Sequence, residues 1–321
     1  MYSFNEPTLV PVFRLFGMPV YPYALCIALG AAVALVMALL RARRTGLPAA
    51  AVLNFALLGI PLAACCGRVA FCLCRFVDVL DFGVGYIFRL DYGGFSLMGV
   101  VVGLLIAAFL TRLISRVPLA QLLDTVVPGL LIALAFGRFG EGSTMNGTGP
   151  EVTVAALQLF PLARTGLYGD ATFAINMAEG LTAFIAGVYT QAMAAKPRGR
   201  TAGTGVLIAC AGQILWESTR RDEVLTISFV RYVMVFSALV LLVILLLSLH
   251  RLDWPFGGKA LVIAGFFLGV AVCGVMEFFI DGKIWQNVPI WLCYLCDTLA
   301  VCGMAYLCLR TLRAACEDVY Q

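Results

Sequence analysis

Residues 228–249 read SFVRYVMVFSALVLLVILLLSL and contain a single charged side chain, Arg231. A helix that crosses a bilayer needs about 20 consecutive apolar residues, so this stretch predicts a transmembrane helix. Similar apolar stretches lie before and after it, at 20–40, 49–74, 95–111, 119–137, 171–194, 203–217, 259–280 and 287–309. The sequence therefore predicts an all-α, polytopic helical bundle in a membrane, with about nine transmembrane helices.

The composition of the whole chain agrees with a membrane protein. Of its 321 residues, 62% are hydrophobic and 12% are charged, whereas charged residues make up about 25% of a typical soluble domain. The predicted spans leave no room for a large soluble domain. The formal net charge of +4 is too small to indicate nucleic acid as a partner.

The basic residues between the spans predict the orientation of the bundle. If the odd-numbered connections face the cytoplasm, Lys and Arg greatly outnumber Asp and Glu on that side. The positive-inside rule then places the N-terminus outside and the C-terminus in the cytoplasm. The basic residues are Arg41, Arg43, Arg44, Arg112, Arg116, Lys196, Arg198, Arg200, Arg251, Lys259, Arg310 and Arg313, and the acidic ones are Asp253, Glu317 and Asp318.

Residues 250–259, HRLDWPFGGK, interrupt the apolar pattern between the seventh and eighth predicted spans. We therefore predict two parts in the chain: residues 1–250 with seven spans, and residues 251–321 with an additional pair of transmembrane helices. Of the twelve cysteines, most lie inside apolar runs, where a thiol packs as a small hydrophobic group. Cys293 and Cys296 form a CxxC within an apolar segment, so we expect no metal site and no cofactor.

The most distinctive polar segment is FGRFGEGSTMNGTGP, at 136–150, which follows the fourth predicted span. Its five glycines let the backbone approach a ligand and expose amide donors. Arg138 offers a planar fork that fits a phosphate. The segment predicts a site for a phosphate or lipid headgroup; the alternative is a flexible surface loop with an arginine that reaches to the interface.

Further polar side chains are expected on the same side of the membrane. Arg68 lies within the second span, where an arginine is costly and marks a cavity or an anionic partner. Gln213, Glu217 and Arg220 are spaced i, i+4, i+7 and share one helical face. The alternative interpretation of these three residues is that they form only an ion pair within the end of one helix.

Three carboxylates, Asp124, Glu179 and Asp297, fall within predicted spans, where each either orients an arginine or sits in a hydrated pocket. Tyr23 stands at the outer mouth of the first span, as a membrane-interface anchor or with its hydroxyl facing a site. The only histidine, His250, lies at the opposite end of the bundle. A histidine base on the outer face is therefore excluded, and no G-x-S-x-G nucleophile motif is present.

Taken in order, these stretches resemble the prolipoprotein diacylglyceryl transferases, integral membrane enzymes of bacteria. GRFGEGSTMNGTG at 137–149 is similar to the family signature, which opens Gly-Arg-x-Gly-Asn and closes on a glycine twelve residues after the first. The similarity continues, in collinear order over residues 20–250, in YPYALCIALG (21–30), CGRVAF (66–71), GGFSLMGVVVG (93–103), DTVVPG (124–129), AEG (178–180) and QILWESTRRD (213–222).

The resemblance implies transfer of a diacylglyceryl group from phosphatidylglycerol, or a related anionic phospholipid, to the thiol of a lipobox cysteine in a prolipoprotein. Glycerol phosphate is released, and the location implied is the bacterial cytoplasmic membrane. By similarity, Tyr23, Arg68, Arg138, Gly149, Glu217 and Arg220 occupy positions of the family's functional residues. We expect catalytic roles for Tyr23, Glu217 and Glu141, the last as a residue in which this chain differs from the family. The expected substrate-binding residues are Arg68, Arg138, Gly149 and Arg220, together with Asn146 and Gln213, which stand at site positions where the family has other residues.

The chain departs from the family pattern at four positions. Met98 stands where the family has a histidine that helps to deprotonate the thiol. Glu141 replaces an asparagine, Asn146 a glutamate and Gln213 an arginine. One histidine and one arginine are thus lost from the chemical site.

Two accounts follow from these departures. In the first, the chain still transfers a lipid-derived group, with Glu141 or Glu217 as the base, because a free thiol is already a few per cent thiolate at neutral pH. In the second, it is a non-catalytic lipid-binding or accessory membrane protein that keeps the headgroup site.

Overall fold

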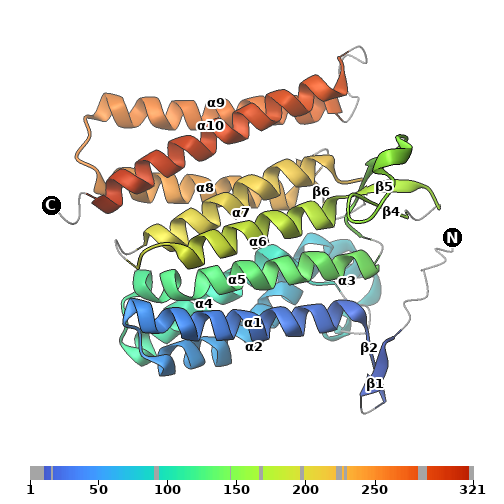
Figure 1. Cartoon of the computed structure of the whole chain (residues 1–321), viewed down its shortest axis with the longest axis horizontal. Coiled ribbons are helices and arrows are strands. Elements are labelled where there is room, and N and C mark those ends of the chain that lie inside the picture. The colour runs from blue at the N-terminus through green and yellow to red at the C-terminus, as the bar shows by residue number, and fades with distance from the viewer. Residues whose placement is uncertain are drawn as a thin grey trace.

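Nine long helices lie side by side in the part of the chain that the structure describes (Figure 1). The computed structural model describes residues 11–15, 17–89, 94–144, 146–165, 169–195, 199–221, 226–227, 230–280 and 288–317. This arrangement confirms the predicted all-α membrane bundle. The helices are α1 (Pro22–Thr45), α2 (Ala49–Cys74), α4 (Leu97–Ser115), α5 (Leu119–Glu141), α6 (Ile175–Ala192), α7 (Arg200–Thr219), α8 (Tyr232–Arg251), α9 (Phe256–Ile280) and α10 (Ile290–Glu317).

Among the described residues, seven helices are long and apolar enough to cross a membrane: α1, α2, α4, α5, α8, α9 and α10. The other two, α6 and α7, have 18 and 20 residues. Both carry buried polar side chains, among them Glu179 on α6 and Gln213 and Glu217 on α7. The two helices that depart from the apolar pattern thus each bring a buried glutamate into the bundle.

The short elements gather at one end of the bundle (Figure 1). Three antiparallel strands form a small sheet there, in the order β3-β5-β4. The connection between α5 and α6 is thus a folded cap rather than a simple turn. The short elements are α3 (Phe76–Phe82), the 3-10 turns η1 (Val84–Phe88), η3 (Gly142–Thr144) and η4 (Ala155–Leu157), and the strands β1 (Phe13–Leu15), β2 (Met18–Val20), β3 (Thr148–Glu151), β4 (Ala163–Thr165), β5 (Ala171–Ala174), β6 (Thr226–Ile227) and β7 (Val230–Arg231).

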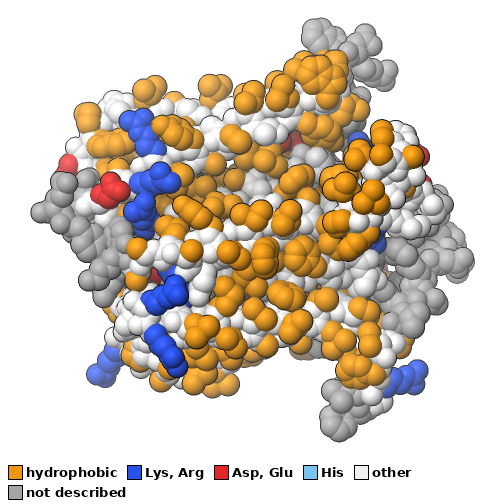
Figure 2. Space-filling model, viewed as in Figure 1, with side chains coloured by type: hydrophobic (Ala, Val, Ile, Leu, Met, Phe, Trp, Pro, Cys, Tyr) orange, Lys and Arg blue, Asp and Glu red, His pale blue; other side chains and the backbone are white. Residues whose placement is uncertain are grey.

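The surface of the bundle is mostly hydrophobic along the length of the helices (Figure 2). On the face shown there, Lys and Arg side chains form a column near the end where α10 finishes, opposite the folded cap. The positive-inside rule associates such a basic end with the cytoplasm. The cap between α5 and α6 is accordingly predicted to lie outside.

We expect a cysteine at Thr153 to react with an impermeant thiol reagent added to intact cells. Thr153 is exposed in the cap between β3 and η4. The matched control is Asp253→Cys, which is exposed in the α8–α9 connection at the other end of the bundle. Labelling is measured as the gain over the unsubstituted chain, which has cysteines of its own. If Asp253→Cys reacts in intact cells and Thr153→Cys only after lysis, the predicted orientation is wrong.

Helices α1 and α5 pack closely because glycines lie at their contact. A Cβ atom on Gly129 of α5 would come within 2.5 Å of the carbonyl oxygen of Ala34 on α1. Similarly, a Cβ on Gly140 would lie 2.6 Å from Cβ of Cys26. Small residues are typical of such close helix contacts in membranes. This packing places the end of α5 against the first turn of α1.

Substituting Gly129 with Ala is expected to destabilise the protein by about 1–3 kcal/mol, the usual cost of overpacking. The new methyl group would meet backbone, so the two helices must separate. Gly137→Ala is the matched control on the same helix, because nothing lies within 4 Å of the position of its Cβ. Thermal denaturation in detergent measures both variants, and equal melting temperatures would contradict this account of the α1–α5 contact.

Arg41 was counted above among the charges of a connection, but the structure places it inside the bundle, with 1% of its surface exposed. Its guanidinium donates to the backbone oxygens of Asp124 (2.7 Å) and Gln191 (2.8 Å) and to the hydroxyl of Thr201 (3.0 Å). The Asp124 carboxylate accepts hydrogen bonds from the backbone amides of Gly199 and Ala202 at the start of α7. Asp124 thus caps α7, and Arg41 joins α1, α5, α6 and α7.

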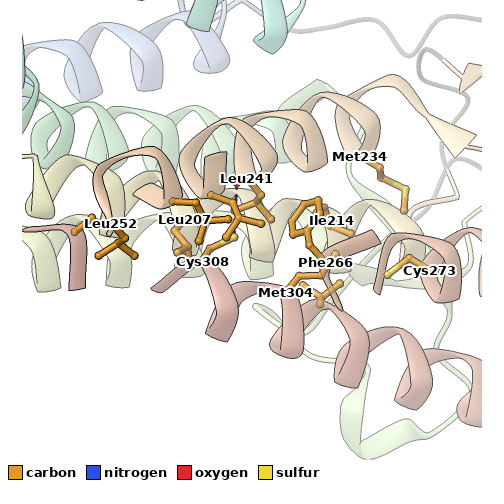
Figure 3. Close-up of a cluster of buried hydrophobic side chains, with 13 residues drawn as sticks. Leu207, Ile214, Met234, Leu241, Leu252, Phe266, Cys273, Met304 and Cys308 are labelled. Atoms are coloured by element: carbon orange, nitrogen blue, oxygen red, sulfur yellow. Dashed lines mark hydrogen bonds between the residues drawn. The ribbon is translucent and has the colours of Figure 1, made fainter. Parts of the chain in front are cut away.

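The last pair of helices shares a hydrophobic core with α7 and α8 (Figure 3). In that view, Leu207 and Ile214 of α7 and Leu241 of α8 face Phe266 of α9 and Met304 of α10. The pair α9–α10 therefore packs against the helix that carries Gln213 and Glu217. A division of the chain near residue 250 stays a prediction.

Candidate active site

A cluster of charged side chains lies at the capped end of the bundle, where α5, α6 and α7 meet. Arg138 and Glu141 belong to the last turn of α5, and Glu179 to the second turn of α6. Three more members come from the end of α7, from the residue after it and from β7. They are Glu217 of α7, Arg220 directly after α7, and Arg231 at the end of β7.

Two arginines from different segments share the same carboxylates. Arg138 contacts Glu141 (Nη1–Oε2, 2.8 Å), Glu179 (Nε–Oε2, 3.2 Å) and Glu217 (Nη2–Oε1, 3.6 Å). Arg220 contacts Glu141 (Nη2–Oε1, 2.5 Å), Glu179 (Nη1–Oε2, 3.1 Å) and Glu217 (Nη1–Oε1, 3.6 Å). The two guanidinium groups are therefore held side by side by three glutamates.

Gln213, on α7, connects two of these glutamates through its side-chain amide. Its amide nitrogen donates to Glu179 Oε1 at 2.6 Å and to Glu217 Oε1 at 3.0 Å. The second of these bonds, together with the Arg220–Glu217 contact, confirms the helical face predicted from the spacing of Gln213, Glu217 and Arg220. The alternative interpretation, an ion pair within one helix end, explains only the contact between Arg220 and Glu217. It does not explain the contacts of these residues with α5 and α6.

The cluster is nearly closed to its surroundings. The side chains of Glu179 and Arg220 are 1% and 2% exposed and that of Glu217 is 5% exposed, whereas Arg138 and Glu141 are 12% and 13% exposed. Removing one partner of a buried ion pair costs about 3–5 kcal/mol, because the other charge is left uncompensated. A ligand that reaches the cluster must approach from the Arg138–Glu141 edge.

Tyr23 lies beside that edge. It stands in the first turn of α1, 36% exposed, and its Cδ2 atom is 3.3 Å from the place where a Cβ on Gly140 would lie. The hydroxyl interacts electrostatically with Glu141, Arg138 and Arg220. Tyr23 thus lies near the Arg138–Glu141 edge, and a role of its hydroxyl in the site stays a prediction.

Other residues expected in the site have different contacts. The Arg68 guanidinium donates to the backbone oxygens of Tyr86, Ile87, Arg89 and Gly94, and so holds the connection between α3 and α4. These four carbonyl oxygens accept the hydrogen bonds of Arg68 in the part of the chain that the structure describes. A substrate contact of Arg68 stays a prediction.

Asn146 and Gly149 lie in the cap rather than among the charged groups. Asn146 is exposed, and its backbone oxygen accepts a hydrogen bond from Arg164. A Cβ on Gly149 would lie 2.8 Å from Ile175, so glycine here lets β3 approach the start of α6. Met98 is partly buried in the first turn of α4.

Two members of the cluster were not assigned to it from the sequence. From the sequence, Glu179 is a carboxylate within a predicted span and has no assigned partner, and Arg231 is the one charge in an apolar run. Arg231 donates to the backbone oxygen of Arg220 (2.9 Å), and its Nε lies 3.9 Å from Glu217 Oε2. Both are charged residues in otherwise apolar spans, and this feature of the sequence could have indicated that they belong to the site.

A cleft of about 320 Å³ opens next to the cluster, between the cap and the end of α7. Its lining is mainly apolar, and Trp216, which belongs to it, also lines a smaller pocket with Glu179 and Gln213. Such a volume lies within the range of small-molecule sites. Among the described residues, no group of three or more His, Cys, Asp or Glu side chains is placed to hold a metal ion.

The fold and the cluster together define a polytopic membrane protein that holds paired arginines and carboxylates at one end of its helices. The chain belongs to the prolipoprotein diacylglyceryl transferase family, whose profile matches residues 11–250. The family shown by this match is the one that the sequence motifs resemble.

Curated relatives match at low identity. The phosphatidylglycerol-prolipoprotein diacylglyceryl transferase of Oceanobacillus iheyensis is 23% identical over 244 residues, which cover 73% of this chain and 85% of the relative. The protein of that name from Enterococcus faecalis is 29% identical over 181 residues, 54% of this chain and 65% of the relative. That from Clostridioides difficile is 28% identical over 129 residues, 40% of this chain and 52% of the relative.

Proposed function

We propose that this chain is a transferase of the bacterial cytoplasmic membrane that moves a diacylglyceryl group from phosphatidylglycerol to the cysteine thiol of a prolipoprotein. One observation supports the proposal beyond family membership. Arg138 and Arg220 converge on Glu141, which together with Arg138 forms the more exposed edge of the cluster. Fixed cations at such a place stabilise the charge that develops on a leaving phosphate.

In the proposed reaction, the thiol sulfur attacks the glycerol carbon that carries the phosphate ester. A carbon–sulfur bond forms while the carbon–oxygen bond to phosphate breaks, and glycerol phosphate leaves with the electron pair. The thiol proton passes to a carboxylate. Arg138 and Arg220 bind the phosphate oxygens, and the Tyr23 hydroxyl donates to the same group from the open edge.

Glu217 is the stronger of the two candidates for the base. Both oxygens of Glu141 are engaged, at 2.8 Å by Arg138 and at 2.5 Å by Arg220. By contrast, Glu217 lies farther from the arginines, at 3.6 Å from Arg138, 3.6 Å from Arg220 and 3.9 Å from Arg231. A base needs an oxygen that can accept the proton, and the longer arginine contacts of Glu217 oppose this less than those of Glu141. Gln213 would then orient this carboxylate through Oε1.

An accessory function is the second candidate. The arginines of the cluster are already paired with glutamates, and Met98 stands where the resemblance placed a histidine. A protein that holds a headgroup without transferring it would tolerate both features. The two candidates differ in whether lipoproteins become modified.

The cell-based test uses bacteria depleted of their own prolipoprotein diacylglyceryl transferase and supplied with this chain. We expect mass spectrometry of their lipoproteins to show the diacylglyceryl modification on the lipobox cysteine. The Arg138→Ala variant, expressed to the same level in the membrane, should not restore it. Unmodified lipoproteins in cells that contain well-inserted protein would overturn the proposal in favour of the accessory function.

A further inference from the structure

The carboxylate of Glu141 bridges Arg138, at the open edge of the cluster, and the more deeply buried Arg220. Its Oε2 atom accepts from Arg138 Nη1 at 2.8 Å, and its Oε1 atom accepts from Arg220 Nη2 at 2.5 Å. Each oxygen therefore has a guanidinium of its own. A phosphate group presents two oxygens to two guanidiniums in the same manner.

The charges of the cluster are balanced with Glu141 included. Among the described residues, three arginines (Arg138, Arg220 and Arg231) face three glutamates (Glu141, Glu179 and Glu217). A phosphate that entered this set would add an uncompensated negative charge in a poorly solvated place, which is unfavourable. If one carboxylate moved out as the phosphate moved in, the balance would be kept.

Glu141 is the carboxylate best placed to move. Its side chain is 13% exposed, against 1% for Glu179 and 5% for Glu217. Its backbone is fixed, since Thr144 and Ser143 donate to the backbone oxygens of Glu141 and Gly140, both at 2.8 Å. Displacement then requires rotation of one side chain at the end of α5 and no change of the helix.

We propose that the Glu141 carboxylate occupies the place of a phosphate group, and that an anionic headgroup binds to Arg138 and Arg220 by displacing it. This inference rests on the proposed function for the identity of the ligand, which is a phosphate ester. Glu141 then sets which ligands enter. Only a group that binds both guanidiniums better than the internal carboxylate gains access.

Equilibrium binding to the purified full-length protein tests this inference without any transfer reaction. Isothermal titration calorimetry compares three probes: dihexanoyl phosphatidylglycerol, sn-glycerol 1-phosphate, and the neutral lipid dihexanoylglycerol. In Glu141→Gln the competing charge is gone. We expect it to bind both phosphate probes about tenfold more tightly or better, the low end of the effect of a charge-assisted hydrogen bond. The neutral lipid should bind the variant and the original protein equally.

The source of the phosphate is distinguished by the same measurement. A gain for the lipid and for glycerol phosphate assigns the subsite to the phosphate itself, and a gain for the lipid alone assigns it to a phosphate held in the membrane. The matched control is Glu317→Gln, the same change at an exposed position at the other end of the bundle. It should leave all three affinities unchanged.

Glu141→Asp provides a second variant in case the Gln variant fails to fold. Its carboxylate keeps the charge but is one methylene shorter, so it cannot reach both arginines at once. We expect its affinity for phosphatidylglycerol to lie between those of the original protein and Glu141→Gln. Equal or weaker binding of the phosphate probes by the folded Glu141 variants would overturn the inference. Failure of the transfer assay would not, because binding is measured directly.

Discussion

Replacement of Glu217 with Gln is expected to lower the rate of diacylglyceryl transfer by about 10²-fold or more, the usual effect of losing a general base. The amide keeps the size of the side chain and can still accept from Gln213, whose nitrogen lies 3.0 Å from Glu217 Oε1. It cannot take up the thiol proton. The rate is measured with purified protein, phosphatidylglycerol and a cysteine peptide, while the affinity for lipid should change little.

The comparison with Glu141→Gln identifies which carboxylate is the base. If Glu217 accepts the proton, Glu141→Gln retains most of the maximal rate. If Glu141 accepts it, the large loss appears in Glu141→Gln instead, and our assignment is wrong. Met98→His, at the position where the family pattern has histidine, should restore part of the rate lost in the variant that lacks the base.

Arg138→Lys should lower transfer by about 10²-fold, although the positive charge is kept. An ammonium cannot reproduce the planar fork, which here contacts Glu141 with Nη1 and Glu179 with Nε. The loss of one fixed donor at a developing negative charge typically reduces the rate by about 10²–10³-fold. Steady-state kinetics with phosphatidylglycerol as the varied substrate measures the effect.

Arg75→Lys is the matched control for this change. Arg75 is also paired with a carboxylate three residues away, at 2.7 Å from Asp78, but its side chain is 53% exposed. Exposed ion pairs contribute about 0–1 kcal/mol, so we expect no change in transfer. Equal kinetics for Arg138→Lys and the original protein would contradict a direct contact between Arg138 and phosphate.

The helices were predictable because a helix that faces lipid needs a long run of apolar residues, and such a run is visible in the sequence alone. The run at 228–249 corresponds to α8, Tyr232–Arg251, and the least apolar run, at 203–217, to α7, Arg200–Thr219. Even the polar face of α7 follows from local spacing. Periodicity does not show which helices meet, so the approach of α1 to α5 at Gly129 required the structure.

The site was predictable where its residues are neighbours in the sequence. Gln213, Glu217 and Arg220 are spaced i, i+4, i+7 and so lie on one face of a helix. Arg138 and Glu141 are three residues apart, on neighbouring turns of α5. The links between these groups join residues far apart in the chain, such as Arg220 and Glu141. Spacing carries no information on such pairs. For the same reason, the sequence predicts Arg41 in a connection on the basic side, whereas the structure buries it among four helices.

The most direct test of the central claim is a transfer assay with purified protein, phosphatidylglycerol and a lipobox peptide that carries one cysteine. Mass spectrometry measures the peptide, and an enzymatic assay measures free glycerol phosphate. We predict that diacylglyceryl peptide and glycerol phosphate appear in equal amounts, and that neither appears with Arg138→Ala or with a peptide in which serine replaces cysteine. Protein that binds phosphatidylglycerol but forms neither product would contradict the account.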